Sequence, residues 1–241
     1  MKTNLLIFLS LLLLSSCTMQ PQYIETNGQL HTPYRILYQY TEPLDDEIHA
    51  ELKRYYHSLN PFDSLSIISQ VNRNKEVEVD TLFAEVFRKA REVSSRTNGM
   101  YDITCAPLIN LWGFGFSKMD SVTPQMIDSI RSFVGYQKVR LEGRHIIKDD
   151  PRLLLNCSSM GDGCSYEVIT RLLESKGIRN YMIDIGGEFA TKGVNAKGQC
   201  WHLGIAKPVD DPMGVNQETE VIVQLCGRLG LATSGDYRNF Y

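Results

Sequence analysis

The sequence predicts an α+β fold, in which short helices pack on a mixed, mostly antiparallel sheet. Segments that alternate in the manner of strands recur along the chain, and Glu142-Gly143 joins two of them as a hairpin. Between such segments, apolar residues repeat at helical spacing, as at 44–59 and 82–93. The chain is 43% hydrophobic and 22% charged with net charge −3, an ordinary globular balance without a basic stripe, so we expect no nucleic-acid partner.

The first residues form a segment of a different kind. Lys2 precedes an apolar run, Leu5 to Leu14, that is too short to span a bilayer and has the form of a signal-peptide core. Leu14-Ser15-Ser16-Cys17 closes it and resembles a bacterial lipobox, in which the cysteine becomes the lipidated first residue. We therefore predict a lipoprotein signal peptide at 1–16 and a lipidated N-terminus with a polar tether at 17–33. A secretory signal with an incidental cysteine is the alternative.

The remaining cysteines are scattered, with no C-x-x-C pair and no histidine partner at metal spacing: Cys105, Cys157, Cys164, Cys200 and Cys226. An odd, scattered set argues against a disulfide framework. We expect most of them to be buried as small hydrophobic residues, and the histidines to be structural or surface residues.

Residues 34–40 alternate and are rich in aromatic and β-branched side chains, which predicts a strand. Pro43 opens a helix whose first turn carries Asp45, Asp46 and Glu47. Acids are favourable at a helix N-terminus, so we interpret them as a solvated face rather than a metal cluster.

A turn containing Pro61 and Asp63 then leads into a short helix that Ser64 or Ser66 caps. Asp80 is the predicted N-cap of a longer helix that stops at Asn98-Gly99, and Thr123-Pro124 starts another.

The stretch 97–116 turns at Asn98-Gly99, carries one acid, Asp102, and runs into an apolar segment that ends in Trp-Gly-Phe-Gly-Phe. Its glycines let the backbone approach a flat ligand, and Trp112, Phe114 and Phe116 are candidates for a pocket wall. A turn followed by a core strand is the plain alternative.

Residues 154–167 predict a buried strand, a loop of small residues and then a helix that ends at Gly177. A glycine- and serine-rich turn of this kind offers backbone N–H groups to an anion such as a pyrophosphate. Farther on, 179–188 read as a strand entering a Gly-Gly turn, and further strands are predicted at 201–208, 220–226 and 229–237.

Two of these motifs resemble the ApbE-type family of FAD:protein FMN transferases. Gly99-Met100-Tyr101-Asp102 is similar to the family's Gly-x-Phe-Asp turn, and 107–115 read Pro-Leu-Ile-Asn-Leu-Trp-Gly-Phe-Gly where the family has Pro-Leu-Val-Asn-Leu-Trp-Gly-Phe-Gly. The segments at 154–167, 179–188, 201–208, 220–226 and 229–237 agree in the same order. The resemblance implies an ApbE-like FAD-binding catalytic domain at 34–241.

Carried over position by position, the resemblance implies FAD-binding residues and a metal ligand. FAD would be held by Leu30, Phe62, Met100, Tyr101, Asp102, Asn156 and Asp162. The carbonyl of Ser159 would be a ligand of Mg²⁺. The chain departs from the pattern at Leu30-His31-Thr32, where the family has Met-Gly-Thr, and at Asn156, where it usually has Asp. A core aromatic is the alternative interpretation of Phe62. For Asp102→Ala we expect lost FAD affinity with little loss of fold.

The implied reaction is Mg²⁺-dependent transfer of FMN from FAD to a threonine of a target flavoprotein, such as a subunit of a membrane redox complex, with release of AMP. The alternatives are an FAD pyrophosphatase giving FMN and AMP, and a non-catalytic FAD-binding lipoprotein. The lipobox implies a bacterial cell-envelope protein, anchored by lipid to the periplasmic side of the inner membrane.

Family members continue for roughly a hundred further residues, a domain-sized share of a chain. That part carries His-x-Ile-Asp-Pro-x-Thr-Gly and an Asp and Thr that complete the magnesium site. We therefore expect the C-terminal part of the domain to be missing from the sequence, and little Mg²⁺-dependent transfer by this chain alone.

Overall fold

The computed structural model describes residues 21–115, 121–208 and 218–235. The expected signal peptide, the lipobox cysteine Cys17 and Phe116 lie outside these ranges, as does the side chain of Asp162. Within the described ranges, no helix is both long enough and apolar enough to cross a membrane.

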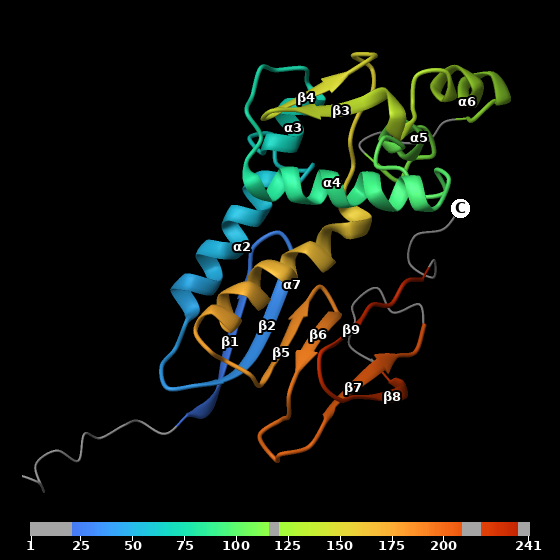
Figure 1. Cartoon of the computed structure of the whole chain (residues 1–241). Helices are drawn as coiled ribbons and strands as arrows, with labels where there is room; N and C mark the ends of the chain where they lie inside the picture. Colours follow the sequence, from blue (N-terminus) through green and yellow to red (C-terminus); the bar gives the residue numbers. More distant parts are fainter. Residues whose placement is uncertain (1–20, 116–120, 209–217, 236–241) are drawn as a thin grey trace, which may run out of the picture.

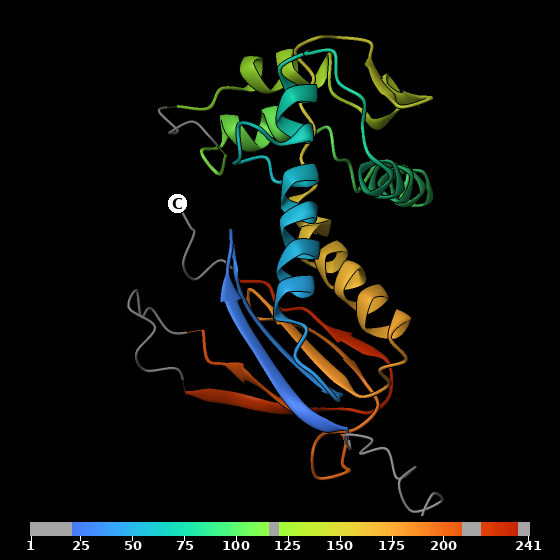
Figure 2. The same ribbon diagram turned by 90° about the vertical axis from the view of Figure 1, so that its left-hand side faces the viewer.

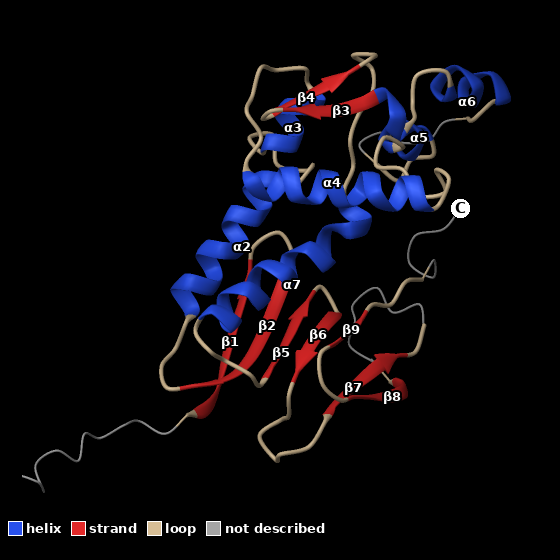
Figure 3. Ribbon diagram, in the orientation of Figure 1, coloured by secondary structure: helices blue, strands red, loops and turns tan. Residues whose placement is uncertain are grey.

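A five-stranded sheet forms the base of the molecule (Figures 1 and 3). Its order is β1 (Gln22–Gln29), β2 (Pro33–Tyr40), β5 (Tyr181–Ile185), β6 (Glu188–Lys192) and β9 (Leu229–Leu231). Every neighbouring pair in it is antiparallel. The α+β class with a mostly antiparallel sheet is therefore confirmed.

Strand β1 corrects the predicted tether at 17–33. Gln22 to Gln29 pair residue by residue with Tyr40 to Pro33, so this part of the segment belongs to the sheet. Thr26 is buried at its centre, and its hydroxyl shares a 3.1 Å hydrogen bond with the Tyr38 hydroxyl. β1 is an edge strand rich in polar residues, and for that reason it lacks the apolar alternation that would have revealed it.

The sheet is covered on both faces (Figure 2). Helices α2 (Asp45–Leu59) and α7 (Ser158–Ser175) pack on one face, where Ile48, Leu52, Ile169 and Leu173 meet the buried residues of β2 and β5. The hairpin of β7 (Trp201–Ala206) and β8 (Thr219–Leu225) packs on the other face. Successive strand residues point to opposite faces, so Met182 contacts the hairpin while Ile183 contacts the helices.

A second core lies at the C-terminal end of α2 and the N-terminal part of α7 (Figure 1). Its buried side chains come mostly from α3 (Ile67–Asn72), α4 (Thr81–Arg96), the hairpin of β3 (Val139–Glu142) and β4 (His145–Lys148), and the adjoining parts of α2 and α7. The same region of the fold contains α5 (Ala106–Leu111), α6 (Pro124–Arg131) and a 3₁₀ turn (Tyr136–Lys138) (Figure 1). Phe83 and Phe87 of α4 are almost fully buried at its centre.

The predicted helix starts in this region are confirmed. Ser66 accepts the Ser69 N–H, Asp80 accepts the Phe83 N–H, and Thr123 accepts the Met126 N–H. Each bond satisfies one of the N–H groups that a helix start leaves without an intrahelical partner.

Two expectations about local structure are wrong. The small residues after Asn156 are not a loop, because Ser158 to Cys164 are already the first two turns of α7. The apolar residues after Cys105 form the short helix α5 rather than a core strand.

The cysteine expectation is wrong for one pair, whereas Cys157 is buried as expected. Cys200 and Cys226 form a disulfide whose Cα atoms lie 4.8 Å apart, closing the base of the β7–β8 hairpin. Its two ends are 26 residues apart in the sequence, so the pairing depends on the hairpin register.

Candidate functional site

The two sequence motifs meet at the start of α7. The Asn156 N–H donates to the carbonyl of Ile103 at 2.8 Å, and a parallel β-bridge joins Cys105 to Leu154. The Asn156 side chain then turns the chain into the helix, because its Oδ1 accepts the Ser158 N–H at 2.7 Å. An amide oxygen suffices for this contact, which accounts structurally for Asn at a position where a carboxylate was expected.

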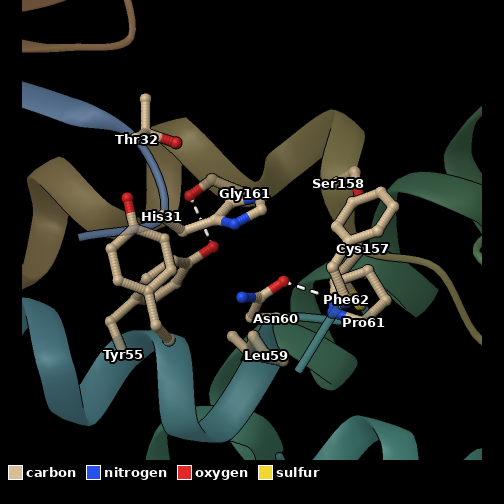
Figure 4. A pocket seen from close by; sticks show the side chains of 11 residues that line it. His31, Thr32, Tyr55, Leu59, Asn60, Pro61, Phe62, Cys157, Ser158 and Gly161 are labelled. Carbon is tan, nitrogen blue, oxygen red and sulfur yellow. Dashed lines mark hydrogen bonds between the residues drawn. The ribbon is translucent and has the colours of Figure 1, made fainter. Parts of the chain in front are cut away.

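A cavity of about 150 Å³ opens beside this helix start (Figure 4). Three separate segments line it: the β1–β2 connection, the end of α2 with the turn that follows, and the first residues of α7. Its lining residues include His31, Thr32, Tyr55, Asn60, Phe62 and Ser158. The sequence therefore brings Phe62 and the small-residue segment to one place.

Tyr55 joins α2 to α7 at the floor of this cavity. Its hydroxyl donates to the carbonyl of Gly161 at 2.6 Å. A Cβ added to Gly161 would lie 3.2 Å from that hydroxyl oxygen, tighter than ordinary packing allows. Glycine at 161 thus permits the two helices to approach each other here.

The turn after α2 presents Phe62 to the cavity. Asn60 accepts the Phe62 N–H at 3.0 Å through its Oδ1. The carbonyl of Pro61 accepts the Ser69 hydroxyl at 3.0 Å. The ring of Phe62 is 56% exposed, so it is a rim residue and not the core aromatic of the alternative interpretation.

Leu30 lies at the same connection as His31 but faces the other way. It packs against the core between the sheet and its helices, whereas His31 and Thr32 line the cavity. Leu30 is thus outside the cavity lining, which includes the next two residues instead.

The Met100–Asp102 turn borders a second hollow, of about 370 Å³. Met100 is 90% exposed. Both carboxylate oxygens of Asp102 accept backbone N–H groups at 2.8 Å, Oδ1 from Thr104 and Oδ2 from Tyr136. Asp102 therefore holds the 135–136 turn in place, which argues against the expectation that its removal causes little loss of fold.

Tyr101 itself lines neither of these two hollows. Its ring packs against the second core, and burial raises the pKa of its hydroxyl to about 12, against a smaller lowering by the Ser159 side chain. Although Ser159 is close, no hydrogen bond of normal geometry satisfies this buried hydroxyl among the described residues. The hydroxyl is therefore a polar group left for a ligand or water at the junction of the two motifs.

The described residues do not by themselves fit the magnesium site implied for Ser159. Ser159 lies in the first turn of α7, where a helical carbonyl accepts an N–H four residues later. Within the described ranges, no group of three His, Cys, Asp or Glu side chains is placed to hold a metal ion.

The aromatic run after α5 is exposed. Trp112 is 39% exposed and Phe114 is 52% exposed, so neither belongs to a core.

The cavity at α7 is also lined by residues that the sequence did not indicate as site residues. The sequence pattern indicated Tyr55 as a core position of a helix and Asn60 as part of a turn. Their place in the cavity lining depends on tertiary structure, which local patterns do not show.

Comparison with known proteins agrees with this geometry. The model of the ApbE family matches residues 30–241. The chain is 32% identical to the FAD:protein FMN transferase of Vibrio cholerae, over 100% of the chain and 74% of that protein. It is also 32% identical to the FAD:protein FMN transferase of Salmonella typhimurium, over 82% of the chain but only 58% of that protein. The chain thus spans between 58% and 74% of the length of these two relatives.

Solved structures show the same fold. The flavin transferase ApbE from Vibrio cholerae superposes with a TM-score of 0.76 at 30% identity, covering 92% of this chain and 74% of that one. The apo flavinyl transferase ApbE of Pseudomonas stutzeri gives a TM-score of 0.76 at 24% identity, covering 94% of this chain and 75% of that one, and supports the fold alone. From the family match, the sequence relatives and the shared fold, the chain belongs to the ApbE family.

Proposed function

We propose that this chain is a transferase that moves FMN from FAD to a threonine hydroxyl of a target flavoprotein and releases AMP. The observation that carries the proposal is the cavity at the start of α7, where the β1–β2 connection, the Phe62 turn and the Asn156–Gly161 segment converge. The relatives' names supply the reaction. The rest of the support is physical.

The start of α7 suits a pyrophosphate. The helix is 18 residues long, and its dipole favours negative charge at that end. The N–H groups of Ser158 and Met160 already have acceptors, so the dipole is the main contribution. Phe62 offers an exposed aromatic face for a planar ring beside it. In this proposal, the start of α7 holds the phosphates of a flavin dinucleotide and Phe62 holds one of its rings.

The transfer itself exchanges one phosphorus–oxygen bond for another. The threonine oxygen bonds to the FMN phosphorus, the bridging bond of the pyrophosphate breaks, and AMP leaves with the bridging oxygen. The threonine proton is lost to a base that we do not assign. In this scheme the chain's own part is to hold the phosphates at α7 and keep the flavin in place.

The proposal includes a requirement for magnesium, and only the family resemblance supports this part of it. The described residues offer at most the carbonyl of Ser159, so we assign no step to the ion. Repeating the transfer assay with magnesium and with a chelator tests the requirement.

The direct test of function incubates the 241-residue chain with FAD, magnesium and an acceptor flavoprotein. In-gel flavin fluorescence detects the modified acceptor, and chromatography detects AMP and free FMN. Labelled acceptor together with AMP is the expected result, in small amount, because little transfer is expected of this chain alone. Free FMN and AMP without labelled acceptor would replace the transferase by an FAD pyrophosphatase.

We also propose that the mature protein is anchored by lipid at Cys17 and faces an oxidising compartment. The lipobox pattern supports the anchor, and the Cys200–Cys226 disulfide supports the compartment, because disulfides persist where thiols are not kept reduced.

This proposal predicts that cells expressing the whole sequence incorporate labelled palmitate into the protein. The Cys17→Ala variant should carry no label, because the thiol that takes the acyl group is gone. Label retained in Cys17→Ala would contradict the anchor.

A further inference from the structure

The rim of the α7 cavity is closed by a contact between two aromatic rings. The His31 imidazole is stacked on the Phe62 ring, with centroids 5.4 Å apart and planes inclined by 16°. The Tyr56 ring also meets His31, edge-on, with centroids 5.8 Å apart. His31 belongs to the β1–β2 connection and Phe62 to the α2–α3 turn, so the stack joins two distant segments across the cavity (Figure 4).

The cavity below this stack is too small for FAD. Its volume is about 150 Å³, whereas pockets for ligands of drug size measure roughly 300–1,000 Å³. A planar ring also cannot slip between His31 and Phe62 at their present spacing. Two stacked contacts at van der Waals distance need about 7 Å between the outer planes, and these centroids are 5.4 Å apart.

His31 is the partner that is free to move. The turn that carries Phe62 is fixed by the bond from its N–H to Asn60 and by the Ser69 hydroxyl on Pro61. The ring of His31 is exposed, and among the described residues no hydrogen bond holds it. Rotation of one exposed side chain would uncover the face of Phe62 and enlarge the cavity.

We propose that His31 gates the site: it covers one face of the Phe62 ring in the free protein and gives way when a ring of the flavin dinucleotide takes its place. The inference rests on the proposed function and adds a residue that sets affinity and entry. When a flavin dinucleotide ring binds, it replaces the stacked contact between His31 and Phe62. Removing that one aromatic contact should change the affinity for FAD by about two- to ten-fold.

The test is FAD binding by stopped-flow fluorescence and calorimetry, with the full chain and three variants. His31→Ala should bind FAD about two- to ten-fold more tightly, with faster association, because no ring must be displaced. His31→Phe keeps a stack and should bind no more tightly than the natural protein. His202→Ala is the matched control, since His202 is an exposed histidine on β7.

Two further proteins, Phe62→Leu with and without His31→Ala, test whether the gate acts through Phe62. In a Phe62→Leu background, His31→Ala should no longer raise affinity. The gate is contradicted if His31→Ala binds FAD no more tightly than the natural protein. It is also contradicted if His31→Ala raises the affinity for FAD as much in the Phe62→Leu background as in the natural one.

If none of these proteins binds FAD, the proposed function and the gate are both wrong. If all of them bind FAD with the same affinity, only the gate is wrong.

Discussion

Among single residues, Asp102 has the largest structural role, because its side chain joins its own turn to the backbone at Thr104 and at Tyr136. Its carboxylate spans from its own turn to the N–H groups of Thr104 and Tyr136. Thr104 extends the link by accepting the Gly135 N–H at 2.8 Å. Gly135 has φ of 139°, a conformation that glycine adopts readily, so this turn needs both the glycine and its acceptors.

We therefore predict that Asp102→Ala lowers the free energy of unfolding by about 2–3 kcal/mol, since two charge-assisted hydrogen bonds are lost and two N–H groups are left without their acceptor. Asp102→Asn keeps one acceptor oxygen and should lose less. Urea unfolding followed by circular dichroism measures both. Equal stability of all three proteins would show that the carboxylate is not structural.

Tyr101 gives the fold a dependence on alkaline pH. Burial raises its folded pKa to about 12, from about 10 in an unfolded chain. Between these values the folded state binds more protons, so stability is full below pH 10 and falls as the pH rises toward 12.

The Tyr101→Phe variant should show a smaller decrease of stability over this pH window. At neutral pH it should be as stable as the natural protein or slightly more so, because no hydrogen bond of normal geometry is lost. Thermal unfolding at a series of pH values provides the measurement. A large loss of stability at neutral pH would mean that the hydroxyl has a structural partner.

At the scale of elements, the β7–β8 hairpin depends on its disulfide. The hairpin packs on the sheet through few buried side chains, among them Trp201, Leu203 and Leu225. Cys200 and Cys226 close a loop with a sequence separation of 26, for which the chain-entropy model gives about 3–4 kcal/mol.

Replacing both Cys200 and Cys226 by serine should accordingly lower stability by about that amount, with the earliest hydrogen exchange in β7 and β8. The matched control is Cys105→Ser, which removes a thiol outside any disulfide. If the thiols of Cys200 and Cys226 react with a labelling reagent in the folded natural protein, the bond assigned here is absent.

Sequence patterns predicted the elements whose signal is local. Caps such as Asp80 and Ser66 and the hairpin around Gly143 depend only on neighbouring residues, and the structure confirms them. The start of α7 was mistaken for a loop because glycines at 161 and 163 lower helix propensity. The tertiary contact from Tyr55 to Gly161 belongs to the packing that overrides this tendency.

At the scale of the whole molecule, the candidate site lies where the two cores meet. The β1–β2 connection brings His31 and Thr32 from the sheet side, and the turn after α2 brings Phe62 (Figure 4). The family motifs predicted Phe62 and the α7 segment, since those residues carry the resemblance. They did not predict Tyr55, Asn60 or the stacked His31, because these enter the site only through the packing of distant segments.

The central claim is that the cavity at the start of α7 is where this chain binds FAD. Calorimetric titration of the 241-residue chain with FAD, beside Phe62→Ala and Leu65→Ala, tests it most directly. Leu65 is the matched control because it is an apolar side chain of the same turn, 72% exposed and outside the cavity lining. A ligand ring covers more of Phe62 than the imidazole does, so Phe62→Ala should bind FAD about five- to ten-fold more weakly, and Leu65→Ala should bind it unchanged. Equal affinity of the natural chain and Phe62→Ala would contradict the claim.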